Sequence, residues 1–295
     1  MVFKLTSSVK ALNQTANKMR IDIIRMVCAA GSGHTAGSLG MADVFAALYF
    51  GIAKHDPKNP RWDGRDRIIL SNGHICPVLY AALAECGYFQ KEKLITLRKL
   101  GSPLQGHPHL GALPGIESSS GPLGQGLSQA CGIALALKMD KKDNLVFCLT
   151  SDGEHQEGQT WEAAMFASKF KLANVVQIMD RNNIQIDGKT EDIMPLEPLR
   201  KKYEAFGWDV IEVEGNNMQK VYDALLHASK KAREKPNSKP IIIIANTIAG
   251  KGILSIEGDY KWHGIAPKAE EAKKMIEELE LANKDCKTWV HAKKK

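Results

Sequence analysis

Leu145-Val146-Phe147-Cys148-Leu149 is an apolar run that leads into Ser151-Asp152-Gly153-Glu154, and residues 175–179 lead in the same way into Asp180-Arg181-Asn182-Asn183-Ile184. An Ala-rich segment with the composition of a helix, about residues 159–170, lies between them. A strand, a helix and a second strand of these lengths predict a right-handed βαβ unit with parallel strands. The polar residues then meet at the carboxyl edge of the sheet, where open α/β sheets bind ligands.

The two polar stretches offer ligands for a hard cation. Asp152 supplies a carboxylate and Asn182 a carboxamide oxygen, and such a cation would also hold phosphate oxygens. Each residue also has a structural explanation, because Asp152 can cap the following helix and Asn182 and Asn183 are common turn residues. Since both clusters follow strands of one unit, a functional site is the stronger interpretation.

Four histidines lie in glycine-containing loops, namely His34, His74, His107 and His263. A lone loop histidine is usually an ordinary surface residue, and the spacing does not show whether the four converge. His107 and His109 are spaced like part of a zinc site, but no Cys or His pair stands at a matching distance in the sequence.

A glycine-rich run, Gly121-Pro122-Leu123-Gly124-Gln125-Gly126, opens a helix expected over residues 127–139. Its amides and the helix N-terminus can approach an anion, and close packing of helix on sheet explains the glycines as well. A second candidate, Ala249-Gly250-Lys251-Gly252, is not a P-loop. Walker A would require glycine in place of Ala245 and Ser or Thr in place of Gly252.

The length of 295 residues and the 44% hydrophobic content allow a full core. We expect an α/β fold with a doubly wound, mostly parallel sheet and helices on both faces. Further strands are expected near residues 68–70, 208–213 and 241–244. Further helices are expected near residues 9–29, 41–50, 218–234 and 268–284.

Charge, cysteine usage and hydropathy restrict the class of protein. The net charge of +7 permits nucleic-acid binding, but no basic stripe with interleaved aromatic residues accompanies it, so we expect no nucleic-acid partner. Six cysteines without a CxxC pair predict reduced thiols. No apolar run reaches 18 residues and the N-terminus has no signal-like core, so we expect no membrane segment and a cytoplasmic location.

Taken together, the motifs resemble the N-terminal, diphosphate-binding part of the transketolases, which are thiamine diphosphate enzymes. The matching segments occur in family order at residues 32–34, 70–74, 106–108, 120–126, 152–158, 180–188 and 263–264. The resemblance implies the thiamine diphosphate-binding (PP) domain over residues 1–267. A C-terminal helix and basic tail would follow over residues 268–295.

The resemblance also implies residue roles. The ligands of Mg²⁺ or a similar divalent cation would be the side chains of Asp152 and Asn182 and the main-chain carbonyl of Ile184. The cofactor-binding residues would be His74, Gly121, Leu123, Gly153, Asn182 and His263. The catalytic residues would be His34, His107 and His263, with Glu157, and further Glu162, in the acidic network that links paired active sites.

The implied reaction transfers a two-carbon ketol unit from a ketose phosphate to an aldose phosphate, as in the pentose phosphate pathway. In full-length transketolases, later domains supply the glutamate that activates the aminopyrimidine and the arginines that grip the sugar phosphate. We therefore expect one subunit of a split transketolase, with a separate pyrimidine-binding C-terminal subunit in a heterotetramer. The alternatives are a subunit of another thiamine diphosphate enzyme, such as a 1-deoxyxylulose-5-phosphate synthase, or a non-catalytic cofactor-binding subunit.

Overall fold

The computed structural model describes residues 3–284, so the predicted basic tail and Cys286 lie outside the described residues. Its centre is a five-stranded sheet in which every neighbouring pair of strands is parallel. In spatial order the strands are β1 (Arg67–Leu70), β2 (Val146–Ser151), β3 (Val175–Arg181), β7 (Ile241–Asn246) and β6 (Asp209–Glu214). The predicted parallel βαβ unit is confirmed as β2, a helix and β3.

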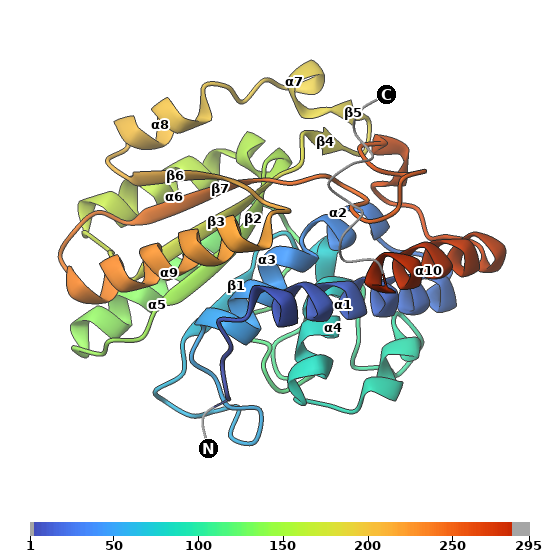
Figure 1. Cartoon of the computed structure of the whole chain (residues 1–295). Helices are drawn as coiled ribbons and strands as arrows, with labels where there is room; N and C mark the ends of the chain where they lie inside the picture. The colour runs from blue at the N-terminus through green and yellow to red at the C-terminus, as the bar shows by residue number, and fades with distance from the viewer. Residues whose placement is uncertain (1–2, 285–295) are drawn as a thin grey trace.

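Helices cover both faces of the sheet (Figure 1). One face carries α1 (Val9–Ala30), α3 (Ala42–Ala47), α4 (Cys76–Cys86), α9 (Met218–Glu234) and α10 (Ala269–Lys284). The other face carries α5 (Gly126–Met139), α6 (Gly158–Lys169) and α8 (Leu199–Ala205). The doubly wound architecture is therefore confirmed.

The direction of the chain explains this division into two layers. The connection through α6 runs from β2 to β3, whereas the connection through α9 runs from β6 back to β7 in the opposite direction along the sheet. Because both crossovers are right-handed, their helices lie on opposite faces. Every residue of β2 and β3 is buried between the two layers, which is why their sequences are almost continuously apolar.

Several short elements were not predicted. The chain forms a hairpin of β4 (Ile184–Gln185) and β5 (Gly188–Lys189), followed by α7 (Thr190–Ile193), and α2 (Thr35–Gly40) follows the first loop. Elements of two to six residues are too short to show a hydrophobic period. The helix expected near residues 41–50 is α3, which continues into a π-helical turn at Leu48–Ile52.

The last helix, α10, packs on the first. Asn17 of α1 donates a hydrogen bond to the main-chain oxygen of Leu279 at 2.8 Å, and the Leu279 side chain is buried in the same core as α1. Within residues 3–284, no helix is both long and apolar enough to cross a membrane. The cysteines of this part of the chain are free thiols, and only Cys28 among them is partly exposed.

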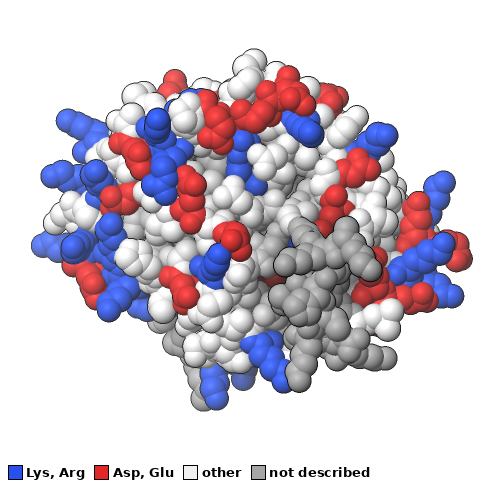
Figure 2. Space-filling model, turned by 45° about the horizontal axis from the view of Figure 1, so that its top comes forward, with Lys and Arg blue, Asp and Glu red and all other residues white. Residues whose placement is uncertain are grey.

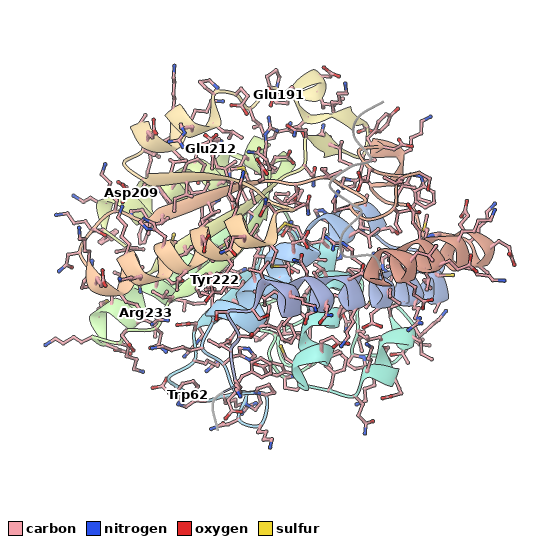
Figure 3. All side chains as sticks on the ribbon, viewed as in Figure 1. Trp62, Glu191, Asp209, Glu212, Tyr222 and Arg233 are labelled. Carbon is pink, nitrogen blue, oxygen red and sulfur yellow. The ribbon has the colours of Figure 1, made fainter. Side chains whose placement is uncertain are left out.

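Basic side chains near the edge strand are interleaved with acidic ones (Figures 2 and 3). Arg200 pairs with Glu204 and Glu212 at 2.9 and 2.8 Å, and Lys231 pairs with Asp209 at 2.8 Å. In the described part of the chain, these basic side chains are therefore paired with acidic ones and form no uninterrupted basic patch.

Candidate functional site

A cavity of about 390 Å³ lies at the carboxyl ends of β1, β2 and β3. The chain leaves β1 toward α4 on one face and leaves β2 toward α6 on the other, so a crevice opens between the two connections. The residues assigned from the sequence to catalysis, cofactor and metal all line it, namely His34, His74, His107, Gly121, Leu123, Asp152, Gly153, Glu157, Asn182, Ile184 and His263. Glu162 lies exposed on α6 and is not part of the lining.

Three of the histidines form a cluster in this cavity. The ring centroids of His34 and His74 are 5.0 Å apart, and that of His263 lies 5.6 and 5.4 Å from these two. His107 lies beside Gly121, where a Cβ would be 3.7 Å from the His107 ring. The convergence that the sequence left open is therefore present.

The histidines of the cluster are neutral near pH 7. Burial and the neighbouring charges of His263, Arg98 and His107 lower the pKa of His34 to about 4. Burial also lowers the pKa of His74 and that of His263. Among the described residues, the Nδ1 atoms of His34 and His263 are buried without a hydrogen-bond partner. Neutral rings with unpaired nitrogens can exchange hydrogen bonds or protons with a polar ligand.

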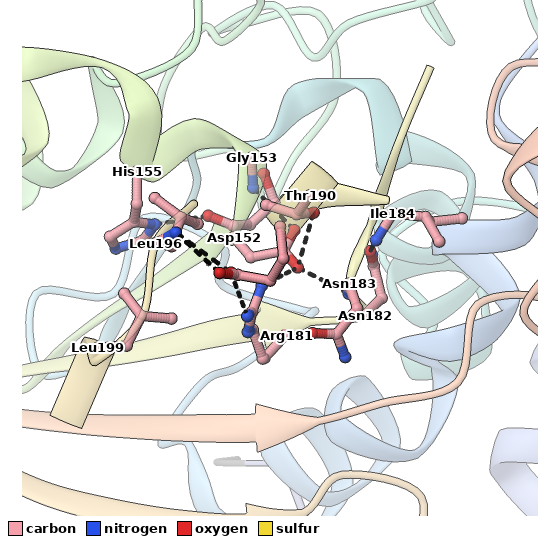
Figure 4. Close-up of polar contacts among 12 residues, drawn as sticks. Asp152, Gly153, His155, Arg181, Asn182, Asn183, Ile184, Thr190, Leu196 and Leu199 are labelled. Carbon is pink, nitrogen blue, oxygen red and sulfur yellow. Dashed lines mark hydrogen bonds and ion pairs between the residues drawn. The ribbon is translucent and has the colours of Figure 1, made fainter. Parts of the chain in front are cut away.

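Asp152 lies at the end of β2, and both its carboxylate oxygens are in use (Figure 4). Oδ1 accepts a hydrogen bond from the Gly153 amide at 2.7 Å, which agrees with the capping explanation. Oδ2 accepts from the Asn183 amide at 2.7 Å, from Arg181 Nη1 at 3.1 Å and from the Thr190 hydroxyl at 3.4 Å. Burial raises the pKa of Asp152, and the charge of Arg181 opposes that rise.

Asn182 is oriented by the residue two positions earlier in β3. Its Nδ2 donates to Asp180 Oδ2 at 2.8 Å, so the other end of the amide, Oδ1, accepts from the Ile184 amide at 3.0 Å. Burial raises the pKa of Asp180 to about 7, and the Thr247 hydroxyl donates a hydrogen bond to its carboxylate. Asn183 has a φ of 64°, so the predicted turn geometry holds for this residue.

The chemistry of these oxygen donors suits a hard cation bound together with a diphosphate. Within the part of the chain that the structure describes, no three His, Cys, Asp or Glu side chains are grouped as a metal site. The predicted set has instead one carboxylate, one carboxamide and one main-chain carbonyl, so further oxygens have to come from a ligand. Gly153 lines the cavity, so its main chain is accessible to such a ligand.

Glu154 is a site residue for which the sequence predicted no role. Its fully buried carboxylate accepts from the Gly124 amide at 2.7 Å, from the Ser151 amide at 3.2 Å and from the Ser71 hydroxyl. These contacts join the ends of β1 and β2 to the glycine-rich run. Its place beside Asp152 in the polar stretch is the signal that could have revealed it.

The glycine-rich run serves both of its predicted purposes. Gly121 lines the cavity, whereas a Cβ at Gly126 would collide with the Ser71 side chain. The Gly126 amide also donates to the Ser71 hydroxyl at 2.9 Å. Close packing therefore explains Gly126, and access to the cavity explains Gly121.

Comparisons with known proteins agree with this geometry. The family described as "Transketolase, thiamine diphosphate binding domain" matches residues 11–288. The chain is 44% identical over 269 residues to the 6-deoxy-6-sulfo-D-fructose transketolase subunit SqwG of Clostridium sp. (strain MSTE9), covering 91% of this chain and 96% of that protein. It is 40% identical to one of the subunits of the apulose-4-phosphate transketolase of Phocaeicola vulgatus, covering 92% of this chain and 94% of that protein.

The fold is also similar to that of solved transketolases. The transketolase of Campylobacter jejuni superposes with a TM-score of 0.84 at 36% identity over 91% of this chain. The match spans 42% of the length of that transketolase, so it concerns one part of the longer protein.

Proposed function

The chain belongs to the transketolase family, in its thiamine diphosphate-binding domain, and from this membership we propose that it is one subunit of a two-chain transketolase. The observation that carries the proposal is that the predicted metal and cofactor residues, the four histidines and Glu157, although scattered in the sequence, line one cavity. The two-chain arrangement is supported by relatives named as subunits, whose length this chain spans almost completely.

The proposed reaction transfers a two-carbon ketol unit from a ketose to an aldose phosphate. The names of the relatives mention 6-deoxy-6-sulfo-D-fructose and apulose 4-phosphate, both sugars with an anionic group. A donor with a phosphate or another anionic group at the end remote from the ketol unit is therefore our expectation for this chain. A role in the pentose phosphate pathway stays a prediction.

The cavity residues fit thiamine diphosphate and a divalent cation. Asp152, Asn182 and the Ile184 carbonyl would hold Mg²⁺ or a similar ion. Gly153, His74 and His263 would contact the diphosphate, and Gly121 and Leu123 would lie beside its rings. When bound, this cofactor supplies the stabilisation of the carbanion that the transfer requires.

The remaining cavity residues would handle protons and positioning. His34, His107 and His263 would exchange protons or hydrogen bonds with the sugar hydroxyls, because neutral imidazoles can act as acid or base near pH 7. Glu157 would join an acidic network shared with a second active site. The heterotetramer, the cytoplasmic location and the division of the chain at residue 267 stay predictions.

The test is an assay of the full chain with thiamine diphosphate, Mg²⁺ and a ketose/aldose phosphate pair, with and without a C-terminal partner chain, which is to be isolated by co-purification. We expect turnover only with the partner. Substantial turnover by the chain alone contradicts the two-chain proposal, and use of pyruvate in place of a ketose donor contradicts the proposed reaction.

A further inference from the structure

Arg181, the last residue of β3, connects Asp152 to the segment that follows (Figure 4). Its side chain is buried, and Nη1 lies 3.1 Å from Asp152 Oδ2. Nη2 lies 2.7 Å from Glu191 Oε1 and 3.1 Å from Glu197 Oε1. One guanidinium thus pairs with one buried carboxylate, one that is partly exposed and one that is exposed.

Contacts with this guanidinium and with its carboxylate partners hold the segment of residues 183–197 in place. Glu191, which Arg181 holds, also accepts from the main-chain amides of Leu196 at 3.2 Å and of Glu197 at 3.4 Å. At the start of the segment, the Asn183 amide donates to Asp152 Oδ2. Because Gln185, Ile186 and Asp187 of this segment line the cavity, its fold determines part of the cavity wall.

The hydrogen bonds divide the two oxygens of Asp152 between two tasks. Oδ2 receives three donors, from Arg181, Asn183 and Thr190. Within residues 3–284, Oδ1 receives only the Gly153 amide, so it retains lone-pair capacity for a cation. Arg181 therefore does not occupy the oxygen that a cation would use, and it keeps the carboxylate from rotating.

Charge supports the same assignment. Arg181 and its three carboxylates sum to −2, whereas the carboxylates alone would carry −3 around a buried group. Without the guanidinium, Asp152 would be a buried carboxylate lacking its counter-charge, and Glu191 and Glu197 would lose the group that holds them together.

We propose that Arg181 is a positioning residue for the cation site. It holds the Asp152 carboxylate through Oδ2, and it fixes the segment of residues 183–197 through Glu191 and Glu197. Cation affinity and the order of this segment then change together. This inference rests on the proposed function only in taking Asp152 as a cation ligand.

The test compares Arg181→Met, Arg181→Lys and the wild-type full chain in a titration with Mn²⁺ and thiamine diphosphate, followed by electron paramagnetic resonance of free Mn²⁺. We expect Arg181→Met to bind Mn²⁺ about 10–100-fold more weakly, the usual effect of losing an outer partner of a metal ligand. Arg181→Lys should lose less, because an ammonium keeps the charge but lacks the planar fork of the guanidinium.

The matched control is Arg65→Met. Arg65 makes a bidentate pair with Glu117 at 2.7 and 2.9 Å and does not line the cavity at the strand ends. This variant should lower the free energy of unfolding and leave Mn²⁺ affinity unchanged. A general loss of stability can therefore be separated from a loss at the cation site.

Amide hydrogen exchange supplies a second measurement that needs no ligand. In Arg181→Met, the Asn183 and Leu196 amides should exchange at least about tenfold faster than in the wild type, and in Arg65→Met they should not. Wild-type or tighter Mn²⁺ binding by Arg181→Met overturns the inference, whether or not exchange is faster, since Arg181 would then be structural only or a competitor of the cation. Absence of Mn²⁺ binding by the wild type overturns the proposed cation site itself.

Discussion

The two ends of the cavity differ in how completely the protein satisfies its own polar groups. At the end formed by Asp152 and Asn182, charged groups are buried and hydrogen-bonded to residues of the same chain. At the end formed by His34, His74 and His263, the rings are neutral, and the Nδ1 atoms of His34 and His263 have no partner in the described part of the chain. The first end is built to hold a charged group in a fixed position, and the second leaves hydrogen-bonding capacity for a ligand that changes during a reaction.

The largest expected effect comes from a substitution at the histidine end of the cavity. In His34→Ala, kcat of the enzyme reconstituted with its partner chain should fall about 10²–10⁴-fold, the usual contribution of a general acid or base. Thiamine diphosphate affinity should change little, because His34 is not among the residues proposed to contact the cofactor. The control is His109→Ala, whose ring is exposed and outside the cavity lining. Equal kcat values for the two variants would remove His34 from the mechanism.

The next largest effect comes from a substitution at the charged end of the cavity. In Asp152→Asn the side chain keeps its size but loses the charge of a proposed cation ligand. Loss of an outer partner of a metal ligand lowers metal affinity by up to about 100-fold, so loss of the ligand's own charge should lower cation affinity by more than that. Calorimetric titration of Mg²⁺ with thiamine diphosphate measures this loss. Asp209→Asn, which removes a surface partner of Lys231, serves as the control and should bind like the wild type. If Asp152→Asn does so too, Asp152 is only a cap.

A smaller effect concerns Glu154, which joins the ends of β1 and β2 to the glycine-rich run. Glu154→Gln replaces one buried acceptor oxygen by an amide that faces a main-chain N–H group, which should lower the free energy of unfolding by about 1–3 kcal/mol. Urea denaturation measures the loss. The exposed partner of Arg200 provides the comparison, since Glu212→Gln should cost at most about 1 kcal/mol. Similar values for both variants would show that the buried contacts of Glu154 matter little.

The smallest effect is a dependence of stability on pH. Burial lowers the pKa of His34 and that of His155 to about 4, below the usual value of 6.5, so the unfolded chain binds more protons than the folded chain between these two limits. The contribution of these two histidines to the free energy of unfolding should therefore decrease as the pH falls from about 6.5 to about 4, whereas Asp180, whose pKa burial raises to about 7, contributes in the opposite direction. His34→Asn should flatten this decrease in denaturation curves measured across that range. An unchanged slope would mean that the His34 ring is not desolvated.

The sequence predicted those features of the two cavity ends that depend on where strands end and on motifs. Asp152 and Asn182 follow apolar runs long enough to be recognised as buried strands, so their meeting at one edge could be inferred. The convergence of His34 with His263 could not be inferred from spacing, because 229 positions separate loops without a period. Only the resemblance to transketolases indicated it.

What the sequence could not show is mostly how residues of different segments contact one another. The β4–β5 hairpin has strands of only two residues, too short to be recognised in the sequence. The ion pairs of Arg181 with Glu191 and Glu197 depend on the direction in which the chain leaves that hairpin. Glu154 and Ser71 are far apart in sequence and meet only because β1 and β2 are neighbours. Such contacts follow from the folded sheet and leave no local pattern.

The most direct test of the central claim locates the cation. Diffraction data collected at the manganese edge, from crystals of the full chain grown with Mn²⁺ and thiamine diphosphate, should show an anomalous peak between the side chains of Asp152 and Asn182 and the Ile184 carbonyl. Electron density for the diphosphate should lie against it, beside Gly153. A peak elsewhere, or a cofactor bound without a cation at these three residues, would contradict the account.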